Sequence, residues 1–451
     1  MRRLSVVAAV AALSLFALGP PLASAAQPRA FVTSARPFLV PLEDGVIVQP
    51  ILTTGDIVGD YQMSGVPDGI GWYPSADGIE LYMNHELNAS FDPSGARVSH
   101  LTLDAEGNVV AGEYVVDGTE GYEWFCSSTL TVIDGTPYYT MGEESKHSPH
   151  QGVALVIDAS TGRVRRAPWF GHIGHENVVP VQGLSKAYVG LSEDGFHEYS
   201  QLYAYEAPTF AGAFDGSEGS LFVWVPDEAV RDGNPSPNDL PKGRSMAGHF
   251  VRIRDAADLR PLQLEKLVQR EGAFDFDRIE DQVADPNSPG TIYFTETGRA
   301  HADVPRGRVY RLDVDPDHPR QATLSVVLDS SAGDDIVSPD NVGISDRALV
   351  IQEDRNWKKS GYNRVLVYDL ASGTLTPVAR TDPDQSIIDE KGLGAWESSG
   401  VVSAADAFGA GWWFLNVQAH YTEMPVPDQT LEPSSATGEG GQLELVFIPG
   451  T

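Results

Sequence analysis

Six apolar segments of this chain end in an acidic or amide signature, and a second polar cluster precedes each of them by about 13 to 21 residues. The segments have the length of β-strands, are rich in Val, Ile, Tyr, Phe and Trp, and are bounded by Gly, Asp, Asn and Pro. From one leading cluster to the next the gaps are about 58, 50, 104, 60 and 57 residues. A unit that recurs at such a spacing is typical of a repeat architecture.

Repeated β-units without helical crossovers predict an all-β fold, a β-propeller of about six blades around a central axis. Equivalent strand ends of all blades then point to that axis, where they gather carboxylate, amide, imidazole and thiol groups. Because crowded carboxylates repel one another, such a ring needs cations or a bound positive group. The apolar segments read LYMNHE, YYTMGEE, AYVGLSED, IYFTETG, ALVIQED and WWFLNVQ, and the leading clusters are Pro67-Asp68-Gly69, Cys126-Ser127-Ser128, His175-Glu176-Asn177, Arg278-Ile279-Glu280-Asp281, Pro339-Asp340-Asn341 and Glu397-Ser398-Ser399-Gly400.

The N-terminal residues 1–25 have the pattern of a secretory signal peptide. Two arginines precede an apolar run over 4–18, and Ala23-Ser24-Ala25 offers a small-residue cleavage site. The run is too short to span a membrane, and no other segment approaches the ~18 apolar residues that a span needs. We therefore predict a secreted or periplasmic protein without a membrane anchor. The arginine pair leaves both the twin-arginine and the general export route open.

The remaining residues, 26–451, are expected to form a single propeller domain, since a large propeller absorbs such a length. We expect a first strand around 45–52, a first repeat from 66 to about 114, and a last strand at 441–448 that closes the ring. The long gap between the third and fourth clusters predicts an inserted loop region at 200–270. This region carries one short helix at 259–269 and is either a lid or a surface loop.

The charge of the chain excludes some partners. It has 63 acidic and 31 basic residues, a formal net charge of −32. Such a surface argues against nucleic acid and against anionic membranes as partners, but is compatible with divalent cations. An acidic coat that only keeps the protein soluble is the plain alternative. We expect a monomer.

The one cysteine, Cys126, excludes an internal disulfide. Because a lone thiol outside the cell is prone to oxidation, it is expected to be buried or metal-bound. Cys126 lies one hairpin before Glu143 and Glu144, so a thiolate and two carboxylates can reach one ion. The alternative is a buried cysteine beside a solvated acidic turn.

The other clusters repeat this design with oxygen and imidazole ligands. Hard oxygen ligands suit calcium, while carboxylate and imidazole also suit iron or zinc. For any single pair a solvated loop explains the residues as well, but several pairs in the same register favour metal binding. The further candidate ligands are His85, Glu86, His175, Glu176, Glu193, Asp194, Glu280, Asp340, Asn341, Glu353, Asp354 and Glu397.

Arg278 differs from the other candidates because it adds a cation to a predicted ring of acids. It either pairs with Glu280 or Asp281, or its planar guanidinium binds two phosphate oxygens. Arg355 and Arg299 are reserve candidates for the same role.

At the level of ordered short motifs, the chain resembles the PhoX-type alkaline phosphatases and their relatives, from about residue 68 to 418. It differs from the usual family pattern after Cys126, before the Glu-Glu pair, and at Asp281, where the family carries Gly. The matching motifs are Asn84-His85-Glu86, Cys126 with Thr136-Pro137 and Glu143-Glu144, His175-Glu176 with Glu193-Asp194, Arg278-Ile279-Glu280 with Phe294-Thr295-Glu296-Thr297, Ser338-Pro339-Asp340-Asn341 with Glu353-Asp354, and Glu397-Ser398-Ser399-Gly400 with Asn416-Val417-Gln418.

The resemblance implies a secreted β-propeller phosphatase with Fe3+ and Ca2+ at its axis. It assigns Cys126, Glu144 and Glu280 to iron and Arg278 to phosphate, and we take Arg278 and Glu280 as catalytic candidates. Arg278, Asn341 and Arg355 are the candidates for binding small phosphorylated substrates. The calcium candidates are Glu176, Glu193, Asp194, Asp340 and Glu353.

Two other functions stay open at this point. A calcium-dependent propeller hydrolase of the lactonase or phytase type needs few ligands and no thiolate. A non-catalytic propeller would use its face to bind a partner or a glycan, with metals in a structural role only.

Overall fold

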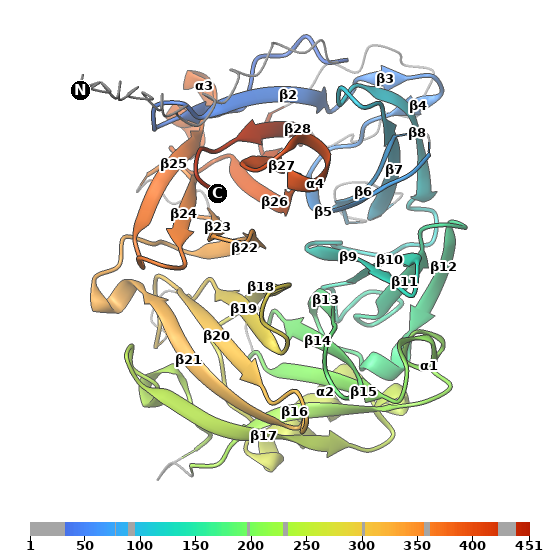
Figure 1. Ribbon diagram of the computed structural model, residues 1–451, viewed down its shortest axis with the longest axis vertical. Helices are drawn as coiled ribbons and strands as arrows, with labels where there is room; N and C mark the ends of the chain where they lie inside the picture. The colour runs from blue at the N-terminus through green and yellow to red at the C-terminus, as the bar shows by residue number, and fades with distance from the viewer. Residues whose placement is uncertain are drawn as a thin grey trace, which may run out of the picture.

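In a computed structural model of the chain, six β-sheet blades surround a central axis (Figure 1), which confirms the predicted all-β propeller. The innermost strands of neighbouring blades contact one another all the way round, and the sixth blade contacts the first. The described residues are 32–76, 78–88, 95–195, 199–228, 233–299, 303–355, 361–422 and 439–451. The predicted signal peptide lies outside them.

The first two blades are four-stranded antiparallel meanders. In each, the chain starts at the axis and moves outward strand by strand. Two short strands, β3 (Ile57–Val58) and β4 (Tyr61–Gln62), precede the first blade. The blades consist of β5 (Pro67–Pro74), β6 (Ile79–His85), β7 (Arg97–Leu103) and β8 (Val109–Val116), then β9 (Ser128–Ile133), β10 (Thr136–Gly142), β11 (Ala154–Asp158) and β12 (Arg163–Ala167).

The third and fourth blades join into one nine-stranded sheet because β17 pairs with β21. Strands β15, β16 and β17 and two helices fall within 200–270, so much of the expected loop region is regular structure. The helix predicted at 259–269 is α2. The elements are β13 (His175–Val181), β14 (Ala187–Glu193), β15 (Leu202–Ala207), α1 (Phe210–Asp215), β16 (Ser220–Pro226), β17 (Ser245–Ile253), α2 (Pro261–Glu271), β18 (Ile279–Ala284), β19 (Thr291–Glu296), β20 (Arg308–Val314) and β21 (Gln321–Asp329).

The last two blades take their outermost strands from the N-terminus, which closes the ring. Strand β1 pairs with β25. Strand β2 pairs with β28, beside which it lies in Figure 1. The expected closing strand at 441–448 is therefore inside the sixth blade, and the N-terminal strand covers its edge. The elements are β1 (Leu39–Pro41), β2 (Ile47–Thr53), β22 (Pro339–Ile344), β23 (Ala348–Glu353), β24 (Arg364–Asp369), β25 (Leu375–Thr381), α3 (Gln385–Lys391), β26 (Glu397–Ser403), α4 (Ala405–Phe408), β27 (Trp412–Ala419) and β28 (Gly440–Phe447).

Six apolar clusters fill the interfaces between consecutive blades. In β6, Leu81 and Met83 pack toward the sixth blade and Tyr82 toward the second, because successive side chains of a strand point to opposite faces. Full burial of such a side chain stabilises the fold by about 1.5–3 kcal/mol. The blades are thus held rigidly around the axis, which fixes the ends of their inner strands. No helix among the described residues is long and apolar enough to cross a membrane.

Candidate metal centre

The repeated sequence clusters lie at one end of the propeller axis. All six leading clusters begin or immediately precede the inner strands, and five of these strands have a β-bulge within their first residues. Val66, Arg278 and Ser338, each directly before such a strand, have positive φ angles of 49°, 69° and 48°. Bulges re-aim side chains next to functional sites. Here they direct alternate polar residues of the inner strands toward the axis.

These side chains line a cavity of about 280 Å³. Its wall also contains Cys126, Arg278 and His420, and the amide of Gln418. Acids from all six blades meet here, as the repeat predicts. The lining carboxylates are Asp68, Glu86, Glu144, Glu176, Glu280, Asp340, Asp354, Glu397 and Glu439.

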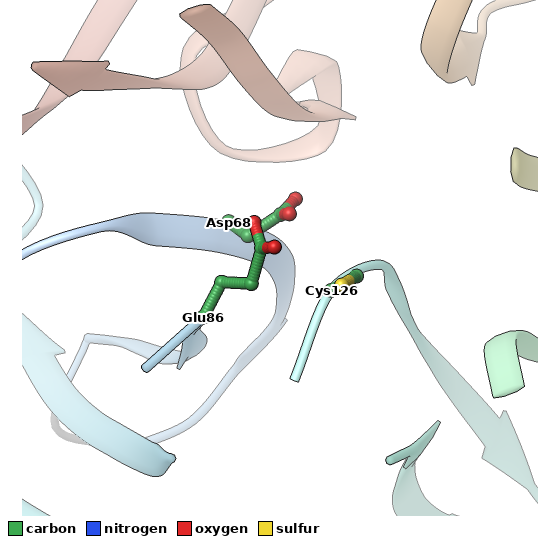
Figure 2. A group of neighbouring side chains, drawn as sticks. All are labelled: Asp68, Glu86 and Cys126. Carbon is green, nitrogen blue, oxygen red and sulfur yellow. The ribbon is translucent and has the colours of Figure 1, made fainter. Parts of the chain in front are cut away.

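Within the cavity, ligand atoms gather into three linked groups that could hold metal ions. The atoms of each group lie within 4.8 Å of one another. Figure 2 shows the first group, in which the carboxylates of Asp68 and Glu86 lie together and Cys126 faces them from the second blade. Cys126 also belongs to the second group, and Glu176 links the second to the third. The groups are Asp68–Glu86–Cys126, Cys126–Glu144–Glu176 and Glu176–Glu280–Asp340.

The electrostatics of the cavity fit bound cations. Burial, and then the neighbouring acids, raise the pKa of Asp68, Glu176 and Asp340 well above their usual values. The pKa of Glu397 rises to about 8 for the same reasons, with Asp354 as the main neighbour. Buried carboxylates that repel one another in this way are stable as charged groups only beside cations. Metal ions would supply that charge.

Cys126 gives one part of the cavity a soft ligand. It is buried, and its Sγ lies 3.2 Å from Oε2 of Glu144. Burial, followed by the charges of Glu86 and Glu176, raises the pKa of the thiol. A thiolate at this position therefore needs a positive charge beside it, which a bound metal ion would supply. Thiolate beside carboxylate suits iron or zinc better than calcium.

Arg278 lies in the wall of the cavity and is fixed by two acids. Its Nε lies 2.9 Å and its Nη2 2.6 Å from Oδ2 of Asp194, and Nη2 lies 3.2 Å from Oε1 of Glu280. Burial acts to lower the pKa of Arg278, but the charges of Asp194 and Glu280 outweigh it, and the pKa is raised. Asp194, predicted as a calcium ligand, instead fixes the plane of the guanidinium.

Two polar side chains, one from the second blade and one from the fifth, donate hydrogen bonds to the acids. The hydroxyl of Ser127 donates to Oε1 of Glu176 at 2.8 Å. The amide of Asn341 donates to Oδ1 of Asp68 at 3.2 Å and to Ser127 Oγ at 2.9 Å. Asn341, predicted as a ligand and as a substrate-binding residue, does not line the cavity. It positions residues that do.

The two histidines that were predicted as ligands have structural partners instead. Nδ1 of His85 lies 2.9 Å from the carbonyl oxygen of Gly65, and Nε2 lies 2.7 Å from Oγ of Ser99. Nε2 of His175 lies 3.1 Å from the carbonyl oxygen of Gly171. Burial lowers the pKa of each histidine to about 3, so both are neutral. The structure brings neither into the cavity.

Two predicted glutamates also point away from the axis. Glu143 accepts hydrogen bonds from the backbone amides of Glu123, at 2.9 Å, and Gly152, at 3.1 Å. Glu193 lies 3.4 Å from Nζ of Lys146. In each case the next residue in the chain takes the position toward the cavity or Arg278, because adjacent residues at a strand end face opposite sides.

Glu353, which is predicted as a calcium ligand, is held by two arginines and does not line the cavity. Arg355 Nη2 lies 2.8 Å from Oε2 of Glu353, and Arg364 Nη2 lies 2.7 Å from Oε1. The carboxylate is fully buried and both arginines are mostly buried. Arg355 is thus engaged in this triad, and the structure does not place it at the cavity as a substrate-binding residue. Of this pair of acids, only Asp354 lines the cavity.

The Glu353→Gln variant separates a structural role from a ligand role. We expect it to reduce the free energy of unfolding by about 3 kcal/mol, because two buried arginines lose their counter-charge. The metal content of the folded protein should equal that of the wild type. Calorimetry and elemental analysis check the two expectations. Loss of metal at unchanged stability would instead make Glu353 a ligand.

The lining residues that were not among the predicted site residues include two further carboxylates, an imidazole and an amide: Asp68, Glu439, His420 and Gln418. The sequence did indicate Asp68, because the dipeptide Pro67-Asp68 begins its inner strand just as Pro339-Asp340 begins the inner strand of the fifth blade. The sequence also indicated Gln418, because this residue ends the last apolar segment, WWFLNVQ. His420 lies 2.6 Å from Glu439, and both flank a segment outside the described residues, so no repeat marks them.

Neither a known family profile nor a curated protein sequence matches this chain. Solved structures do. PhoX of Pseudomonas fluorescens in complex with vanadate, a transition-state analogue, is 13% identical, with 93% of this chain and 97% of that chain covered and a TM-score of 0.64. An α-L-arabinanase of Penicillium chrysogenum is 11% identical, with 90% and 98% covered and a TM-score of 0.43. A soluble aldose sugar dehydrogenase of Escherichia coli is 11% identical, with 89% and 99% covered and a TM-score of 0.39. Over nearly its whole length, the chain therefore has a PhoX-like propeller fold.

Proposed function

We propose that this protein is a metal-dependent phosphatase that hydrolyses phosphate monoesters in the axial cavity. The observation that carries the proposal is the meeting of three linked ligand groups, one thiol and one arginine in the same cavity. The PhoX structure of the same fold holds vanadate, described there as a transition-state analogue, which supports a phosphoryl-transfer site. We further propose that the protein acts as an exported monomer on small phosphorylated substrates.

The donor sets favour two kinds of ion. The group Cys126–Glu144–Glu176 offers a thiolate and suits iron, whereas Glu176–Glu280–Asp340 offers only carboxylates and suits calcium. Glu280, which the family resemblance assigns to iron, thus lies in the all-oxygen group. When bound, such ions neutralise phosphoryl oxygens and lower the pKa of a coordinated water.

The residues of the chain position the phosphate. Arg278 reaches into the cavity. Two nitrogens of its guanidinium donate hydrogen bonds to Asp194, and one of them also forms an ion pair with Glu280. A planar donor fixed in this way can bind phosphoryl oxygens with little loss of side-chain entropy. Phosphoryl transfer depends mainly on such positioning and on charge stabilisation. The buried walls restrict the access of bulk water.

A direct test is hydrolysis of p-nitrophenyl phosphate by protein reconstituted with iron and calcium. We expect turnover that chelation abolishes. Absence of hydrolysis of this ester and of other phosphate monoesters by metal-loaded protein would refute the phosphatase proposal. Turnover of a lactone or of phytate in its place would favour the calcium-hydrolase alternative, and metal-dependent stability without any turnover would favour a binding propeller.

Arg278→Lys should lower kcat/KM for p-nitrophenyl phosphate by about 10- to 100-fold, because lysine keeps the charge but not the planar pair of donors. Arg347→Lys is the matched control, since Arg347 is an exposed turn residue. It should retain the wild-type value. If both variants kept full activity, Arg278 would have no role in binding phosphate.

A further inference from the structure

A second cavity, of about 970 Å³, opens beside the axial one. It lies between the turn that follows β10 and the start of α2. Its wall combines cationic side chains with apolar ones, among them Leu262, which is 57% exposed. We call this second cavity the basic groove. Its lining residues include Trp124, Lys146, His147, Arg260, Leu262 and Lys266.

The charge of the basic groove is opposite to that of the molecule. The chain has twice as many acidic as basic residues, yet three basic side chains line the groove and Glu144 is its one acidic lining residue among those the structure describes. Arg260 and Lys266 are exposed. Within the described ranges, neither has a carboxylate at ion-pair distance, whereas Lys146 lies 3.4 Å from Glu193. Two cations are therefore available to an anion from solvent.

The fold holds these cations in place. Leu264 and Val268 of α2 are fully buried in the apolar cluster between the second and third blades, which anchors the helix. Arg260 precedes the helix and Lys266 is in its second turn, so both project from a fixed element. The N-terminal end of α2 adds a partial positive charge on the same side.

The basic groove and the axial cavity share part of their walls. Trp124 and Glu144 line both. A molecule with its phosphate at the axis can therefore extend its leaving group past Trp124 into the groove. A positive region beside a site also raises the local concentration of anions, which matters in a protein of net charge −32.

We infer that the basic groove is the leaving-group subsite and binds a second phosphate on the substrate. The inference rests on the proposed phosphatase function and deepens it by naming the substrate class. That class is phosphate monoesters whose leaving group carries another phosphate, such as sugar bisphosphates. Arg260 and Lys266 contact the second phosphate, and the apolar surface of Leu262 and Trp124 takes the organic part.

The test compares glucose 1,6-bisphosphate with p-nitrophenyl phosphate, which has no second phosphate. The double variant Arg260→Gln/Lys266→Gln should lower the ratio of kcat/KM for the bisphosphate over that for p-nitrophenyl phosphate by at least ~10-fold. The matched control is Arg252→Gln/Arg254→Gln, which removes the same charge from exposed residues outside the groove. The control should keep the wild-type ratio.

Calorimetric titration of glucose 1,6-bisphosphate into the metal-free protein tests the groove without turnover. We expect binding that weakens at least ~10-fold in the groove variant and not in the control. If p-nitrophenyl phosphate is hydrolysed but neither the ratio nor the binding changes, the groove inference is wrong and the phosphatase proposal stands. If binding depends on the two residues but no ester is hydrolysed, the groove is a phosphate-binding site, whereas the phosphatase proposal fails and the leaving-group role fails with it.

Discussion

Replacing Cys126 by serine should remove most of the iron from the protein and lower kcat for p-nitrophenyl phosphate by more than ~100-fold. Even residues that only support metal ligands typically contribute 10- to 100-fold to affinity or activity, so a direct ligand should contribute more. Serine nearly preserves the size of the side chain, but its hydroxyl is a much poorer soft ligand than a thiolate. Elemental analysis and steady-state kinetics check the two effects together.

The matched control for this substitution is Met141→Leu. Met141 is fully buried in the strand that leads to Glu144, but it does not line the cavity. Its replacement by a side chain of similar volume should leave metal content and kcat near wild type. If Cys126→Ser also retained iron and activity, the thiol would be an ordinary buried side chain. A calcium-only hydrolase would then be the better account.

Removing the metals should make the stability of the protein fall as the pH rises from 5 to 8. Burial, and then the charge of Asp354, raises the pKa of Glu397 from 4.5 to about 8. Burial also raises the pKa of Asp281, which accepts hydrogen bonds from Asn177 and Val342, from 3.8 to about 7. In the unfolded chain both groups ionise near pH 4. The folded state therefore binds more protons in this window and loses them as the pH rises, which lowers the free energy of unfolding.

Calorimetry of chelated protein measures this effect. We expect Tm to fall by at least ~5 °C between pH 5 and pH 8, and calcium with iron to restore it. Glu397→Gln should flatten the slope, whereas Asp406→Asn, at an exposed position, should not. If the Tm of the chelated protein stayed constant or rose over this range, the pKa values of the buried acids would not be raised in the folded state, and the prediction would be wrong.

Much of the architecture follows from the repeat in the sequence. The six leading clusters mark the starts of the inner strands, and the six apolar segments are the strands that pair with them. In four blades the first residue of the inner strand pairs with the last residue of the strand that follows it. Examples are the pairs His175–Glu193 and Pro339–Glu353. The pattern could not show that blade three extends through β17 to blade four, since long-range pairing of outer strands leaves no local signal.

The sequence could not decide which of two adjacent polar residues at a strand end faces the cavity, and this was the main limit in predicting the site. Glu86, Asp194 and Asp354 each follow the last residue of their strand and face the cavity or Arg278, while His85, Glu193 and Glu353 face the opposite side. Because successive side chains of a strand alternate, a register that is uncertain by one residue exchanges ligand and non-ligand. Only the three-dimensional pairing of the strands decides between them.

The most direct measurement of the central claim, that the axial cavity is a metal centre, is the metal content of the purified protein. Inductively coupled plasma mass spectrometry should find iron together with calcium, at least one equivalent of each per chain. Glu176→Gln, which alters the residue shared by two ligand groups, should lower both. A folded protein with less than ~0.1 equivalent of any di- or trivalent metal, even after incubation with iron and calcium, would contradict the account.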